Sequence, residues 1–159
     1  MMKKAPQSDQ MYDLAIVGAG PVGTTLAILA AKRGFSVVLV DARDPAAPLR
    51  QDTRTFAVVR GSWRLLKAAG VTDTLAGQTE PLNGLEAIDG GTHWFGAPGV
   101  LFGTEDLPDD PDGQPLGQMV PAAGLQAALD TACAETAGID WVRGRLFETM
   151  ETGPSSARL

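Results

Sequence analysis

The sequence predicts an α/β fold, in which a Rossmann-like βαβ unit with a parallel sheet is joined to part of an antiparallel sheet. A glycine-rich stretch, Gly18–Gly23, lies between a short apolar run and a helical pattern. A second apolar run ends at Asp41, so that strand, helix and strand follow within about thirty residues. Residues 82–103 are rich in glycine and alternate weakly between apolar and polar, which is typical of antiparallel strands.

The first half of the chain gives the clearest element predictions. We expect residues 1–10 to form a disordered leader and residues 12–17 to form a buried strand. A helix is predicted to begin just past Pro21 and to end at Gly34, because Val22, Leu26 and Leu29 recur at helical spacing. Residues 36–40 form the second strand. A second helix, stopped by Gly70, is predicted from the spacing of Val59, Trp63 and Leu66.

The second half is predicted to return to the parallel sheet. Residues 105–115 are an acidic, proline-rich loop, and residues 118–120 are a short strand. Pro121 is expected at the first position of a third helix that Gly138 ends, with a buried face formed by Leu125, Leu129 and Ala132. Residues 139–142 form a further strand. Residues 145–151 are expected to be extended and to turn at 153–156 into the returning strand of a hairpin.

Composition excludes several classes of function. The 159 residues carry a formal charge of −6, and the basic residues are scattered, which argues against a nucleic-acid-binding surface. Cys133 and His93 are the only residues of their types, so a disulfide framework and a thiol- or histidine-rich metal site are excluded. We interpret Cys133, Trp63 and Met119 as packing residues and His93 as structural. Asp109, Asp110 and Asp112 fit a solvated loop rather than a calcium site.

A charge-free stretch at residues 14–31 could suggest a membrane span or a signal peptide. Glycines and a proline interrupt it, and it divides into a strand pattern and a helix pattern. We therefore expect a cytoplasmic protein.

The motif Gly18-Ala19-Gly20-Pro21-Val22-Gly23 predicts dinucleotide binding. Gly18 would permit a tight turn, Gly20 would let a pyrophosphate approach the backbone, and Gly23 would let the helix pack against the strand. The helix N-terminus would attract the phosphates. Asp41 would accept hydrogen bonds from a ribose and repel a 2′-phosphate. A turn with no ligand would explain Gly18 and Gly23 but not Gly20 or Asp41. The residues alone leave FAD and NAD open.

A resemblance to a known family narrows this choice. Residues 12–43, with Ala27 and Gly34 at further small-residue positions, resemble the N-terminal FAD fingerprint of flavoprotein aromatic hydroxylases. Residues 52–71 resemble the D-x-R…G-S…L-L…G-V stretch of the ubiquinone-biosynthesis hydroxylases, and so do residues 116–120 with the helix that follows. The family acts on polyprenylated phenols and has a para-hydroxybenzoate-hydroxylase-like fold.

The resemblance implies a flavin-dependent monooxygenase that uses NAD(P)H and O₂ to hydroxylate a small aromatic substrate, with possible contact with a membrane surface. Catalytic residues stay unknown and no metal is implied. Arg54 matches a family arginine that contacts FAD, where a fixed cation suits the pyrophosphate, and Gln118 matches a glutamine near the flavin. Pro121 and Ala122 depart from the Glu-Asn that the family often has there. The implied cofactor-binding residues are Gly18, Gly20, Pro21, Val22, Gly23, Asp41, Arg54 and Gln118.

The resemblance also implies a division of the chain. Residues 11–80 would be the first part of an FAD-binding domain, residues 81–116 part of a substrate-domain sheet, and residues 117–159 the continuation of the FAD-binding domain. The family's later Asp-Gly and Gly-Asp motifs do not appear, so we expect an N-terminal portion that is inactive alone. The alternatives are another FAD- or NAD-dependent oxidoreductase and a non-catalytic dinucleotide-binding module.

Overall fold

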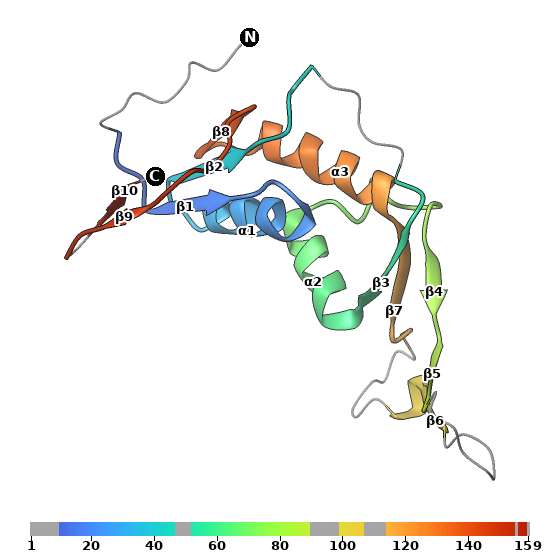
Figure 1. Ribbon diagram of the computed structural model, residues 1–159. Coiled ribbons are helices and arrows are strands. Elements are labelled where there is room, and N and C mark those ends of the chain that lie inside the picture. Colours follow the sequence, from blue (N-terminus) through green and yellow to red (C-terminus); the bar gives the residue numbers. More distant parts are fainter. Residues whose placement is uncertain (1–9, 47–51, 90–98, 107–113, 155, 159) are drawn as a thin grey trace.

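The computed structural model of the chain describes residues 10–46, 52–89, 99–106, 114–154 and 156–158. Residues 1–9 of the predicted leader lie outside these ranges, and so do His93 and the acidic residues Asp109, Asp110 and Asp112. The described part of the chain contains two sheets of three strands and two strand pairs, together with the helices that connect them (Figure 1).

A parallel sheet forms the first half of the fold. It has the order β1-β2-β8, from β1 (Leu14–Val17), β2 (Val37–Asp41) and β8 (Ile139–Arg143). Helix α1 (Pro21–Lys32) connects β1 to β2, so the predicted βαβ unit is confirmed. Gly34, with φ of +90°, follows the helix in the left-handed region that glycine tolerates best.

Two helices, α1 and α3 (Ala122–Glu135), form the part of the hydrophobic core beside this sheet, and the same core continues to Val58, Leu66 and Val120. Ile16, Leu39 and Trp141 are neighbours across the sheet, and all three pack into the core. Cys133 is buried there, as its interpretation as a packing residue requires. The fully buried residues of this layer include Ala27, Ile28, Val37, Leu129 and Ile139.

An antiparallel sheet stands beside the parallel one. Its order is β3-β7-β4, from β3 (Thr55–Val59), β7 (Gly117–Pro121) and β4 (Glu80–Leu82). Helix α2 (Arg60–Ala69) follows β3 and ends at Gly70, whose φ is +87°. The sequence predicts α2 and its stop but not β3, because it places Val59, the last residue of β3, on the buried face of the helix.

The remaining strands form two pairs. Strands β5 (Gly84–Ile88) and β6 (Gly99–Gly103) form an antiparallel hairpin, which lies at the end of the molecule far from the parallel sheet and is followed by the short helix η1 (Thr104–Asp106). Strands β9 (Glu151–Thr152) and β10 (Ala157–Arg158) form the second pair. The expected antiparallel strands are therefore present, but β4 pairs with β7 and not with β5. Residues 145–150 are not a strand, contrary to expectation.

Two details of the predicted helices are wrong. Pro121 is the last residue of β7 and caps α3, rather than starting it. Val22 and Leu26, which suggested the apolar stripe of α1, are 84% and 48% exposed, while the opposite side of the helix is buried. Nearly every residue of α1 is apolar or small, so the sequence period marks a helix without selecting its inner face. No helix among the described residues has the length and apolarity needed to cross a membrane.

Candidate functional site

The loop between β1 and α1, residues 18–20, turns sharply out of the parallel sheet. The N–H of Gly18 donates to the carbonyl oxygen of Val40 at 2.8 Å, which ties the loop to the end of β2. Gly18 has φ of +98°, a conformation that residues with a Cβ rarely adopt. The predicted tight turn is therefore present, and it needs glycine at this position.

Gly23 is constrained by packing. A Cβ at this position would overlap the carbonyl oxygen of Gly18 and would lie 3.3 Å from Cγ2 of Ile16. The absence of a side chain thus lets the first turn of α1 approach the end of β1 closely, as the motif predicts.

Gly20 differs from the other two glycines because neither its φ nor any contact among the described residues requires glycine there. A Cβ at Gly20 would meet no atom within 4 Å, and its φ of −74° suits any residue. The space beside Gly20 is open, and α1 begins there without a side-chain cap and without an acidic residue in its first turn. Exposed N–H groups and the positive end of the helix dipole therefore face open space, which suits a pyrophosphate.

Pro21 and Val22 occupy the first turn of α1 at this opening. Pro21 has no N–H to leave unpaired, and Val22 directs a largely exposed side chain away from the core. The side chain of Val22 stays more than 4 Å from the position that a Cβ at Gly20 would take. The loop and the helix start thus fit the diphosphate of a dinucleotide.

Asp41 ends β2 beside this loop, where the motif predicts a ribose-binding carboxylate. Its Oδ2 accepts a hydrogen bond from the N–H of Ala19 at 2.6 Å, and its Oδ1 accepts one from the N–H of Arg43 at 2.7 Å. The side chain is only 15% exposed. Asp41 therefore holds the loop in addition to facing it, a role that the sequence analysis did not identify. Each oxygen keeps lone-pair capacity for a ribose hydroxyl.

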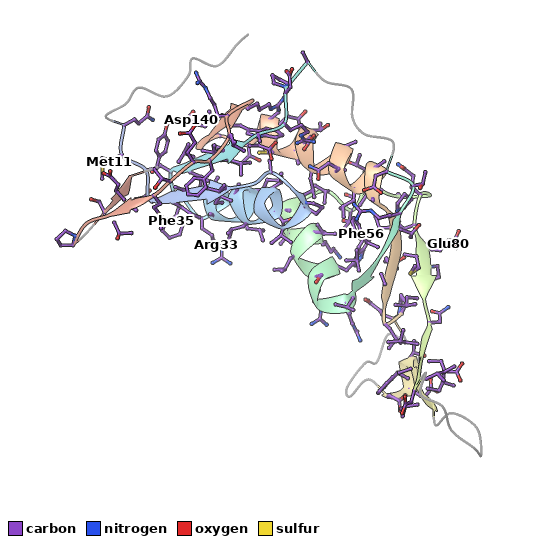
Figure 2. All side chains as sticks on the ribbon, viewed as in Figure 1. Met11, Arg33, Phe35, Phe56, Glu80 and Asp140 are labelled. Atoms are coloured by element: carbon purple, nitrogen blue, oxygen red, sulfur yellow. The ribbon has the colours of Figure 1, made fainter. Side chains whose placement is uncertain are left out.

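Arg54 and Gln118 lie on the antiparallel side of the molecule. The Arg54 guanidinium donates to Asp52 at 2.6 and 2.9 Å, and these hydrogen bonds hold the pKa of Asp52 at about 2. The Arg54 guanidinium also lies 5.7 Å from the ring centre of Phe56, a residue of β3 that Figure 2 labels. Gln118 is half-buried in β7 between Val58 and Pro81. Within the described residues, no hydrogen bond joins either side chain to the loop, so their predicted contact with FAD stays a prediction.

Residues of α3 complete the site, and sequence analysis missed them. Gln126 donates from Nε2 to the carbonyl oxygen of Ala19 at 3.0 Å and to Oδ1 of Asp130 at 2.7 Å. Asp130 also forms an ion pair with Arg43, at 3.0 Å between Nη1 and Oδ2. The spacing of Gln126 and Asp130 predicts that they are neighbours on one helix face, but nothing local indicates that this face meets the loop.

A tyrosine–carboxylate pair lies apart from the loop, where the chain enters β1. The Tyr12 hydroxyl donates to Oδ2 of Asp140 at 2.7 Å. Burial, that hydrogen bond and the nearby negative charge together raise the pKa of Tyr12 to about 12. Figure 2 shows Asp140 on the same side of the molecule as Met11 and far from Phe56. This pair therefore stabilises the chain entry and takes no part in the candidate site.

No group of three or more potential metal ligands occurs in the part of the chain that the structure describes. A parallel βαβ unit with an open glycine loop, an uncapped helix start and an acidic strand end defines a dinucleotide-binding domain. Residues 11–146 match the family model described as an FAD binding domain, and the chain therefore belongs to that family. FAD is therefore the cofactor that this membership indicates.

Two curated relatives of the chain carry ubiquinone-related names. The chain is 40% identical over 90 residues to ubiquinone hydroxylase UbiL of Rhodospirillum rubrum, a match that covers 55% of the chain and 21% of that protein. It is 35% identical over 127 residues to 3-demethoxyubiquinol 3-hydroxylase of Escherichia coli, covering 77% of the chain and 30% of that protein. The chain thus spans less than a third of the length of these relatives.

Solved structures show the same fold. The flavin-dependent monooxygenase PieE, solved in complex with FAD and substrate, matches 95% of the chain with a TM-score of 0.65 and 20% identity, over 27% of its own length. AlpK matches 93% of the chain with a TM-score of 0.67 and 21% identity, again over 27% of its length. The fold of the chain is therefore shared with part of the flavin-dependent monooxygenase PieE and with part of AlpK.

Proposed function

We propose that the chain is the FAD-binding portion of a monooxygenase that hydroxylates the ring of a polyprenylated phenol in ubiquinone biosynthesis. The observation that carries the proposal is the open, uncapped start of α1 beside Gly20 and Asp41, which suits the ADP half of FAD. The names of the two curated relatives support the substrate class, since one is a ubiquinone hydroxylase and the other a 3-demethoxyubiquinol 3-hydroxylase.

The proposed overall reaction consumes one phenol, one O₂, one NAD(P)H and one proton, and it yields the hydroxylated phenol, NAD(P)⁺ and water. Bound FAD would supply the electron transfer and the activation of O₂. The residues of this chain would bind and orient the cofactor. The N-terminus of α1 would face the diphosphate, and Asp41 would accept hydrogen bonds from the adenosine ribose.

Arg54 is proposed to contact the pyrophosphate of the cofactor, and Gln118 is proposed to lie near the flavin. Arg54 is exposed, and its partner Asp52 is a surface carboxylate that a bound phosphate could replace at small cost. The backbone of Arg54 is bound to the start of α3, since the N–H of Ala122 donates to the carbonyl oxygen of Arg54 at 2.9 Å. For a substrate with a lipid tail, we expect a cytoplasmic protein that contacts membrane surfaces peripherally.

The proposal is tested on a protein that contains this chain and supports turnover. We expect flavin absorbance in the purified protein, NAD(P)H oxidation that a polyprenylated phenol stimulates, and a product that carries one oxygen atom from ¹⁸O₂ by mass spectrometry. Bound flavin without oxygen incorporation would reject the monooxygenase in favour of another flavin oxidoreductase. A colourless preparation that binds NAD would reject the FAD site itself.

A further inference from the structure

The backbone of Ala19, in the middle of the FAD-binding loop, is held on both of its polar groups by side chains. Its N–H donates to Asp41 at 2.6 Å, and its carbonyl oxygen accepts from Gln126 at 3.0 Å. Ala19 is almost completely buried, so these two bonds take the place that water would have at an exposed loop.

The two side chains that hold Ala19 are themselves connected. Gln126 donates to Asp130 at 2.7 Å, and the guanidinium of Arg43 meets the same carboxylate at 3.0 and 3.2 Å. The N–H of Arg43 then donates to Asp41 at 2.7 Å. Ala19, Asp41, Arg43, Asp130 and Gln126 thus form a closed circuit of hydrogen bonds, which we call the Ala19 ring.

The Ala19 ring does more than a glycine turn requires. The positive φ of Gly18 and the close packing of Gly23 already form the turn. The ring adds a connection to α3 through two residues one helical turn apart. Its hydrogen bonds to the carboxylates of Asp130 and Asp41 are charge-assisted, and such bonds are roughly twice as strong as bonds between neutral groups. Two residues on a rigid helix therefore set the position of the loop that receives the diphosphate.

The ring also determines what Arg43 can bind. A cation close to the acidic end of the second strand is the group that accommodates a ribose 2′-phosphate in dinucleotide sites. Here the guanidinium lies between two carboxylates, since it pairs with Asp130 and its Nε is 3.7 Å from Oδ1 of Asp41. Its charge is therefore balanced inside the protein rather than offered to a ligand.

We propose that Gln126 and Asp130 are positioning residues for the FAD loop, and that Asp130 excludes a 2′-phosphorylated adenosine by holding Arg43. This inference rests on FAD binding at the loop and is independent of the reaction that the flavin supports. It identifies residues more than one hundred positions from the glycine motif as determinants of affinity and selectivity.

The positioning role is tested with Gln126→Leu, which keeps the size of the side chain and removes both amide hydrogen bonds. We expect FAD to bind this variant about tenfold more weakly, and the Ala19 amide hydrogen to exchange about tenfold faster, while the amides of α3 exchange as before. Thr131→Ala is the control, because it removes an exposed side-chain hydrogen bond to Ala127 from the same helix. If Gln126→Leu does not fold, Gln126→Asn replaces it, since the shorter amide cannot reach Ala19.

The selectivity is tested with Asp130→Asn, using adenosine 5′-monophosphate and adenosine 2′,5′-bisphosphate as competitors of FAD. We expect the unaltered chain to prefer the monophosphate, and the variant to reduce that preference by about tenfold because the charge of Arg43 becomes available. Asp130→Glu should restore the preference. Glu135→Gln, which makes the same charge change at an exposed position of α3, should leave it unchanged.

The outcomes separate the inference from the function. Unchanged FAD affinity and unchanged Ala19 exchange in Gln126→Leu would overturn the positioning role. An unchanged preference in Asp130→Asn would overturn the selectivity. Failure of the unaltered chain to bind FAD would overturn both the inference and the assignment of the site, whereas FAD binding without hydroxylation in the longer protein would reject the proposed function alone.

Discussion

The loop at residues 18–20 and the β5–β6 hairpin are both rich in glycine, yet they are specified in different ways. Loop residues are fixed by contacts with three separate elements, β2, α1 and α3. The hairpin has regular antiparallel pairing, but its large apolar side chains stay exposed, Leu101 by 68% and Ile88 by 60%. Glycine is required at Gly18 by the positive φ and at Gly23 by close packing, whereas the hairpin glycines at 84 and 99 have ordinary contacts.

The largest expected difference is in the free energy of unfolding that a buried and an exposed leucine side chain contribute. Leu129→Ala removes a fully buried side chain from the core on α3 and should lower the free energy of unfolding by about 3 kcal/mol. Leu101→Ala in the hairpin should lower it by less than about 0.5 kcal/mol, because the side chain is mostly in water. Urea denaturation followed by circular dichroism measures both. Equal losses would show that the hairpin is as well supported as the core.

The glycines of the loop provide the next test. Gly23→Ala forces a methyl group against the Gly18 carbonyl and should cost about 2–3 kcal/mol of stability. Gly20→Ala meets no protein atom, so its stability should stay within about 0.5 kcal/mol of the parent while FAD binding falls. Denaturation and FAD titration of both variants separate the two roles. A stable Gly20→Ala chain with full FAD affinity would remove Gly20 from the site.

Asp41→Ala addresses the ribose contact. We expect FAD binding to weaken by about 1–3 kcal/mol, through loss of the carboxylate and of its hold on Ala19. Isothermal titration with FAD gives the affinity, and Asp44→Ala, at an exposed position three residues further on, is the control. If the affinity of Asp41→Ala matched that of the control, Asp41 would have no part in binding.

The smallest effect on stability is expected from Tyr12, where the chain enters β1. The pKa of Tyr12 is about 12, above its ordinary value of 10.0, so the folded state keeps the phenol proton more tightly than the unfolded state does. This contribution to stability is present below about pH 10 and is lost as the pH rises toward about 12. Because Tyr12 is the only tyrosine, tyrosinate absorbance reports it directly. Tyr12→Phe should remove this part of the alkaline loss, and an ordinary pKa would contradict the hydrogen bond to Asp140.

The sequence was sufficient for the parts of the site that depend on local chemistry. The turn at Gly18, the close packing at Gly23 and the position of Asp41 follow from residue types in a short segment, because glycine and the end of a strand restrict the backbone directly. The strand β3 and the pairing of β4 with β7 could not be predicted, since both depend on contacts between distant segments. The same holds for Gln126, which lies 107 residues from its partner Ala19.

Helix α3 joins two distant segments of the chain through adjacent turns. At Ala122 its backbone meets the strand segment that carries Arg54, and four residues later Gln126 meets Ala19. A backbone cut by a protease just before Thr53 would therefore loosen the glycine loop as well as the segment that was cut. The glycine loop and the segment that carries Arg54 are therefore expected to lose their protection from proteolysis together, as one cooperative unit.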